Sequence, residues 1–168
     1  MNAKIRRETT ADVPAIQAVT ISAFRDAPHT SHTEQFIVGE LRKAGSLIIS
    51  LVAEIEGHVE GHVAVSPVSI SDGAVGWFGL GPISVAPQHQ RRGIGSLLMR
   101  EALRILRQHG AVGCVVLGDP GYYGRFGFQV EPNLILPGVP PEYFQAICFD
   151  ATLPRGTVSY HEAFNAQA

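Results

Sequence analysis

The residues best suited to chemistry in this chain are two glycines and two arginines that follow a strand-like run. Trp77 to Val85 is mainly apolar, Pro87 begins a polar turn, and Arg91-Arg92-Gly93-Ile94-Gly95 opens a strongly periodic segment. This order predicts a strand, a tight loop and the start of a helix. The first backbone N–H groups of a helix have no intrahelical partner and lie at the positive end of its dipole. Because glycine lets a ligand approach those amides, the stretch indicates a phosphate or pyrophosphate site.

Two glycines at a strand-to-helix turn are weak evidence alone, because many such turns bind nothing. Two familiar phosphate motifs are excluded. The dinucleotide-binding fingerprint needs a third small residue where Leu98 stands, and the chain has no Gly-Lys-Ser or Gly-Lys-Thr triplet of a P-loop.

The wider pattern is more specific. Val85-x-Pro87-x-x-Gln90-Arg91-Arg92-Gly93-Ile94-Gly95-x-x-Leu98 resembles the acetyl-CoA-binding motif of the GCN5-related N-acetyltransferases, the GNAT family. Downstream, Tyr123-Gly-Arg-Phe-Gly127-Phe128 is similar to the family's Tyr-x-x-x-Gly-Phe segment. The resemblance spans about Ile5 to Phe164 and is strongest toward one bacterial subgroup of the family.

The resemblance implies the GNAT acyl-CoA N-acyltransferase fold, an α/β architecture whose central mixed, mostly antiparallel sheet is flanked by helices. It implies an enzyme that moves the acetyl group of acetyl-CoA directly to a primary amine on a small molecule or peptide. The loop amides would hold the CoA pyrophosphate, and the preceding strand would hold the pantetheine arm. The cofactor-binding residues implied in this way are Ile83, Ser84, Val85, Gln90, Arg91, Arg92, Gly93, Ile94, Gly95 and Ser96.

Tyr123 occupies the family's general-acid position, which implies that its phenol donates a proton to the departing thiolate. A phenol pKa of about 10 and a thiol pKa of about 8.5 are compatible with that transfer. The alternative is that Tyr123 is only a packed aromatic; Tyr122 should point elsewhere. No general base stands out. Glu54 and His62 lie on predicted strands that could face the cleft, but such residues are more often ordinary surface or satisfied side chains. The amine proton can equally leave through ordered water.

Composition bounds the remaining classes. The 168 residues, 45% of them hydrophobic, predict one domain over residues 1–168, with its core at about 4–164. A net charge of −2 gives no general attraction to nucleic acid or anionic membrane. Since no stretch reaches about 18 consecutive apolar residues and the start lacks a signal core, we expect a cytoplasmic protein. Cys114 and Cys148 sit in apolar runs, which favours buried thiols.

We expect no metal site. His29 and His32 stand in a polar loop without a carboxylate or thiolate partner nearby. His58 and His62 are four residues apart on a predicted strand, which separates them by about 13 Å, too far to share a metal.

Periodicity predicts the elements that position these residues. A bulge is expected where Gly79, Gly81 and Pro82 interrupt a strand, and Ala18 and Leu97 are expected to face inward. Phe144–Phe149 and Thr157–Ala163 should complete the sheet as a pair, with a loose tail from Phe164. The other expected strands are 4–8, 47–56, 59–70, 75–85, 112–117 and 128–130, and the expected helices begin near residues 10, 33, 94 and 120.

Two further hypotheses concern assembly and class. The β-prone C-terminal segments need covering, so a homodimer is expected. The alternatives to an enzyme are an acetyl-CoA-binding sensor without turnover, and an interaction protein that does not bind CoA.

Overall fold

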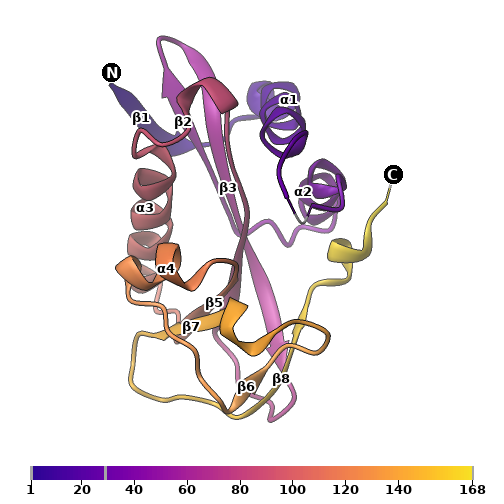
Figure 1. Cartoon of the computed structure of the whole chain (residues 1–168), viewed down its shortest axis with the longest axis vertical. Coiled ribbons are helices and arrows are strands. Elements are labelled where there is room, and N and C mark those ends of the chain that lie inside the picture. Colours follow the sequence, from indigo (N-terminus) through magenta and orange to yellow (C-terminus); the bar gives the residue numbers. More distant parts are fainter. Residues whose placement is uncertain (1, 29, 168) are drawn as a thin grey trace.

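In the computed structural model, which describes residues 2–28 and 30–167, a central sheet separates two layers of helix (Figure 1). The main path of the sheet runs in the order β1-β2-β3-β4-β5-β7. Neighbouring strands on this path are antiparallel except β4 and β5, which are parallel. The expected mixed, mostly antiparallel sheet is therefore confirmed. Its strands are β1 (Ala3–Arg7), β2 (Ile49–Ile55), β3 (His58–Ile70), β4 (Trp77–Val85), β5 (Gly113–Leu117) and β7 (Phe144–Cys148).

Helix α3 (Ile94–Gln108) covers one face of the sheet, and α1 (Val13–Phe24) and α2 (Glu34–Lys43) cover the other (Figure 1). Successive side chains along a strand point to opposite faces of the sheet, so each strand packs against both helical layers. In β3, Val63 packs into the α3 core, whereas Ala64 packs with residues of α1 and α2. Both faces of β3 are therefore covered in its middle, and the polar side chains His62 and Ser66 there are buried.

The buried stripe of α3 is broader than the sequence suggests. Met99 and Leu103 join the predicted core residues of this helix and are buried. These two positions turn the apolar face away from Leu97, which is 45% exposed, so the prediction that Leu97 faces the sheet is wrong. Ala18 of α1 is exposed as well, against expectation, because Thr20 takes a buried position there. The predicted glycine cap is confirmed: Gly110, two residues after the last residue of α3, has φ +78°.

The expected bulge in β4 is confirmed by its register with β3. Val63 pairs with Ile83, but Val65 pairs with Leu80, so β4 holds one residue more than β3 between these pairs. The extra residue falls at Gly81 and Pro82. Gly81 has no side chain to pack, and Pro82 has no backbone N–H to donate to the neighbouring strand.

The C-terminal strands do not pair with each other as predicted. β7 pairs with β5, whereas β8 (Gly156–Tyr160) pairs with the end of β3 and with the short β6 (Leu134–Ile135). The reason is the length of β3: β2 accompanies it only as far as Val65, which leaves the edge at Val68–Ile70 open to β8. The expected strand at 128–130 is reduced to one bridge, from Gln129 to Ala146.

The chain end is also more ordered than predicted. A 3₁₀ turn at Glu162–Asn165 packs against α2, and the Phe164 ring meets Tyr160 edge-on at 4.9 Å between centroids. His29, half of one excluded metal pair, lies outside the described residues.

Candidate active site

The candidate site begins where β4 and β5 part. The two strands pair only from Trp77–Gly113 to Gly79–Val115, although β4 continues to Val85. Among the described residues, no strand pairs with the β5-facing edge of β4 beyond that point. The backbone groups on this edge therefore remain available to an extended ligand.

A loop carries the end of β4 into α3. The Gln90 side-chain amide donates to the Val85 carbonyl at 2.9 Å, which ties the loop to the strand end. Arg91 and Gly93 both have positive φ, +64° and +85°. For arginine this is an uncommon backbone conformation, so the loop is held in a specific shape. Gln90 thus supports the loop through its side chain.

The first turn of α3 presents free amides. Its first helical bond runs from the Leu97 N–H to the Gly93 carbonyl at 3.1 Å. The N–H groups at positions 94–96 precede it and have no intrahelical acceptor. A side-chain Cβ at Gly93 would meet no heavy atom within 4 Å, so this side of the loop is open. Arg91 and Arg92 are exposed at its rim. This arrangement fits a diphosphate group.

The predicted cofactor residues fall into two groups. Ile83 and Val85 pack partly buried against the α3 core, and Ile94 is buried in it. Ser84 is buried too, and its hydroxyl has no hydrogen-bond partner among the described residues. These four can reach a ligand mainly through backbone atoms. Gln90, Arg91, Arg92, Gly93, Gly95 and Ser96 lie in or beside the open loop.

Tyr123 lies on the short helix α4 (Pro120–Tyr123), which follows β5, the strand that parts from β4. Asp119 caps this helix by accepting from the Gly121 N–H at 2.9 Å. The Tyr123 ring packs against Gly118, the first residue after β5. Burial, followed by the nearby Tyr122 and Asp119, raises the pKa of Tyr123 to about 12. The phenol therefore keeps its proton at neutral pH, but it is a weaker acid than a free tyrosine.

Tyr122 does not point away from the site as expected. Its hydroxyl lies 3.0 Å from the position that a Cβ on Gly95 would take, at the start of α3. Arg125 stacks on its ring, with 4.7 Å from the guanidinium carbon to the ring centroid. Tyr122 thus borders the start of α3.

No sequence pattern singled out Tyr160 of β8. Its hydroxyl is buried and has no partner among the described residues. Its ring lies beside Gly79, where β4 and β5 part. Burial raises its pKa, and the neighbouring Cys114 and Tyr123 add to this. No local sequence pattern could have identified Tyr160, because β8 reaches this position only through its pairing with the distant strand β3.

Of the two candidate bases, Glu54 is paired. Its carboxylate accepts from Arg6 Nε at 3.0 Å, and Arg6 also bonds Asp12. His62, in contrast, is fully buried in β3, and its Nε2 lies 2.8 Å from Ser50 Oγ. Burial lowers the pKa of His62 to about 4, against the opposing effect of Glu8. His62 is therefore neutral at pH 7.

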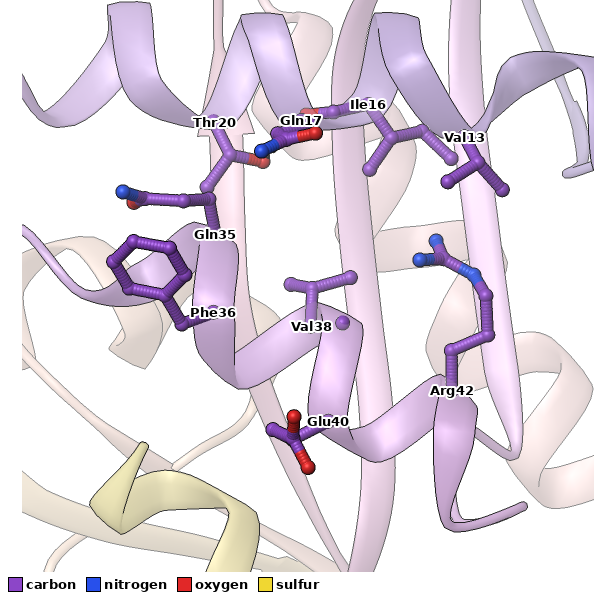
Figure 2. A pocket seen from close by; sticks show the side chains of 10 residues that line it. Val13, Ile16, Gln17, Thr20, Gln35, Phe36, Val38, Glu40 and Arg42 are labelled. Carbon is purple, nitrogen blue, oxygen red and sulfur yellow. Dashed lines mark hydrogen bonds between the residues drawn. The ribbon is translucent and has the colours of Figure 1, made fainter. Parts of the chain in front are cut away.

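A separate cavity of about 200 Å³ lies between α1 and α2. Figure 2 shows Gln17 and Thr20 of α1 and Gln35 and Phe36 of α2 gathered at one end, and Arg42 at the other. Its lining includes no residue of the α3 loop or of α4, so we assign it no part in the cofactor site. Within residues 2–28 and 30–167, no group of three or more His, Cys, Asp or Glu side chains could hold a metal, and no helix is long and apolar enough to cross a membrane.

A sheet whose parallel neighbours part beside a glycine-rich helix start is the arrangement expected from the resemblance to the acyl-CoA N-acyltransferase fold. Residues 4–130 match the family model described as an acetyltransferase (GNAT) domain. The chain belongs to the GNAT family of acetyltransferases.

Two bacterial proteins are among its relatives. The chain is 35% identical over 168 residues to the uncharacterized N-acetyltransferase YhbS of Escherichia coli K12, covering 96% of this chain and 98% of YhbS. The crystal structure of E. coli YhbS with CoA has a TM-score of 0.87 at 34% identity and covers 100% of this chain and 94% of that one. A Brucella melitensis GNAT acetyltransferase in complex with acetyl-CoA also has a TM-score of 0.87, at 47% identity, covering 97% and 98%. The expected resemblance is confirmed.

Proposed function

We propose that this chain transfers the acetyl group of acetyl-CoA directly to a primary amine. The observation that carries the proposal is the parting of β4 from β5 next to the open amides of α3, with Tyr123 on the helix that follows β5. Two relatives of 34% and 47% identity are described in complex with CoA and acetyl-CoA, which supports the same ligand here.

In this proposal, the backbone amides at 94–96 and the side chains of Arg91 and Arg92 bind the pyrophosphate of acetyl-CoA. Each charge-assisted hydrogen bond of this kind contributes about 1.5–3 kcal/mol. The unpaired edge of β4 over Ile83, Ser84 and Val85 binds the pantetheine arm through its backbone. Gln90 holds the loop in register with the strand.

Tyr123 acts as the general acid. The C–S bond of the thioester breaks as the amine nitrogen bonds to the acetyl carbon, and the phenol of Tyr123 supplies a proton to the sulfur. Because burial raises the pKa of Tyr123 to about 12, the phenol is fully protonated before the reaction. It gains most as a donor when negative charge develops on sulfur.

The acceptor is an amine of a small molecule or peptide. From the resemblance to the family, we assign acceptor selection to the loops at 25–33 and 132–141. An assay of CoA thiol release against a panel of primary amines tests the proposal. We expect release only when both acetyl-CoA and an amine are present. Binding of acetyl-CoA without release for any amine would favour a sensor, and no binding at all would favour an interaction protein.

We also infer a cytoplasmic homodimer. β7 is the last strand on the main path of the sheet, and its outer edge is covered only by the bridge from Gln129 to Ala146 among the described residues. Both cysteines are free thiols, as in a reducing compartment. Light scattering at micromolar concentration should give twice the monomer mass of 18.0 kDa. A mass of 18.0 kDa would contradict the dimer.

A further inference from the structure

A chain of hydrogen bonds reaches from β3 to the surface on the side of α1 and α2. His62 Nε2 lies 2.8 Å from Ser50 Oγ, and both side chains are buried. The Ser50 hydroxyl donates to Glu8. The Glu8 carboxylate in turn accepts two bonds from Arg42, at 3.0 and 2.9 Å. Four side chains, from two strands, one connection and one helix, are thus held in one order.

The donors and acceptors in this series of hydrogen bonds determine the tautomer of His62. Burial raises the pKa of the Glu8 carboxyl, but hydrogen bonds from Arg42 and Ser50 outweigh it, so the pKa is lowered and the carboxylate is ionised. Ser50 has one hydroxyl proton, which it gives to Glu8, so its oxygen accepts from His62. His62 therefore carries its proton on Nε2, and Nδ1 keeps a lone pair.

The Nδ1 atom is a buried proton acceptor without a protein partner. None of the described residues forms a hydrogen bond with it. His62 stands directly across from Ser84 in the β3–β4 ladder, and the Ser84 hydroxyl is likewise buried and unpartnered. Ser84 belongs to the segment of β4 proposed to lie along the pantetheine arm. The free nitrogen of His62 is thus on the strand next to the proposed reaction site.

The charged groups around His62 are few. Glu8, after β1, and Arg42, on α2, act on it with opposite signs. Helix α1 and strand β4, which pack on this region, include no titratable residue. At the far end, Glu8, Arg42 and Ser50 line a surface depression of about 220 Å³. The chain of bonds therefore connects solvent with a single interior base.

We propose that His62 is the proton acceptor for the amine, and that Ser50 and Glu8 are positioning residues that hold it in the Nε2–H tautomer. The inference rests on the proposed acetyl transfer. As the C–N bond forms, an N–H bond of the amine breaks and its proton passes through water to His62 Nδ1. The electron pair of that bond stays on nitrogen. The imidazolium faces Glu8 through Ser50, and it returns the proton to solvent when the products leave.

The lowered pKa of His62 makes it a weak base, which limits how long it can hold the proton of the amine. With a pKa of about 4 it is entirely in its base form at neutral pH, but it holds a proton only briefly. The negative charge of Glu8 raises the pKa of His62 against the effect of burial, because a nearby carboxylate stabilises the protonated imidazole.

The test compares four variants in the thiol-release assay between about pH 6 and pH 10. His62→Gln should lower kcat about 10²-fold at pH 7, the lower end of the usual effect of a general base. Ser50→Ala should lower it about tenfold, as for one lost hydrogen bond, and Ser50→Thr should restore it. Both deficits should shrink toward pH 10, where hydroxide replaces the base. The KM for acetyl-CoA should not change. Thr20→Val is the matched control, because it removes a buried hydroxyl that bonds only to Ile16 of its own helix.

Three outcomes would overturn the inference. The first is a kcat within twofold of the wild type for His62→Gln at every pH, while the wild type turns over; this leaves the proposed function standing. The second is a loss of kcat that is equally large at every pH and comes with a lower unfolding temperature, which would show that these hydrogen bonds only stabilise the fold. The third needs no turnover: nitrogen NMR of the wild type that finds the proton on Nδ1 contradicts the tautomer. A wild type that releases no thiol with any amine would instead sink the proposed function.

Discussion

The ring of Tyr123 lies so close to Gly118 that a Cβ on Gly118 would stand 2.5 Å from ring atom Cε2. Glycine is therefore required where β5 leads into α4, because only a residue without a side chain leaves room for the ring in this position. Gly118→Ala should displace the phenol and lower kcat, while acetyl-CoA affinity measured by calorimetry stays near the wild-type value. An unchanged kcat would show that the position of this ring does not matter.

Tyr123→Phe tests the general acid directly. It removes one donor and keeps the packing, so turnover should fall about 10²–10⁴-fold, with little change in acetyl-CoA affinity. Tyr143→Phe is the control, because Tyr143 is 45% exposed. Tyr122→Phe does not serve as a control, since its hydroxyl borders Gly95. Nearly full turnover in Tyr123→Phe would assign the proton to water, Tyr122 or Tyr160 and leave the cofactor site intact.

A bulky side chain in the α3 loop should abolish cofactor binding. Gly93→Val together with Gly95→Val places side chains over the open amides, and each lost charge-assisted bond costs about 1.5–3 kcal/mol. Gly110→Val is the matched control for Gly93: it has a similar positive φ, +78° against +85°, equally open surroundings, and sits at the opposite end of α3. Calorimetry should find acetyl-CoA binding in the control and none in the double variant. Equal affinity in both would remove the loop from the site.

The contact between Trp77 and Gly113 should dominate the stability of the β4–β5 pair. A Cβ on Gly113 would stand 2.3 Å from the indole ring, and Trp77 is almost fully buried. Gly113→Ala should therefore lower the free energy of unfolding by about 1–3 kcal/mol through overpacking. Chemical denaturation measures this, and a second variant, Gly113→Ala with Trp77→Phe, should recover part of the loss. A single variant as stable as the wild type would contradict the contact.

The pair of Arg6 and Asp12 predicts a pH-dependent contribution to stability. Hydrogen bonds from Arg6, then from the Thr9 backbone, hold the pKa of Asp12 well below its usual range. Because the folded pKa is below the unfolded value of about 3.9, the contribution is present above that value and is lost as pH falls toward the folded pKa. Asp12→Asn should be less stable than the wild type at pH 7 by about 1–3 kcal/mol. The gap should narrow as pH falls below about 4, and a constant gap in urea titrations would contradict this account.

The sequence predicted local features of the fold well, because they depend on neighbouring residues. The bulge in β4 follows from Gly81 and Pro82, which remove side chains and a donor from the strand, and the end of α3 follows from Gly110. The partner of β8 was not predictable in this way. It depends on β2 ending opposite Val65, 90 residues or more from β8, a long-range relation that no local pattern carries.

The same distinction between local and long-range features applies to the residues of the candidate site. The loop from Gln90 to Ser96 stands in one motif, so spacing alone located it. His62 was visible on a strand but could not be distinguished from a satisfied core histidine, because Ser50 and Glu8 are distant in sequence. Tyr122 was misjudged because adjacent side chains in a helical turn can both border a cleft when the helix start of α3 lies across from them.

The most direct test of the central claim follows the acetyl group itself. Acetyl-CoA labelled with ¹³C at the acetyl carbonyl is mixed with the protein and with the best amine from the panel, and carbon NMR records the carbonyl signal. The account predicts that the thioester signal is replaced by an amide signal, with one free CoA thiol for each amide formed. Thioester that persists, or that is converted only to free acetate, would contradict it.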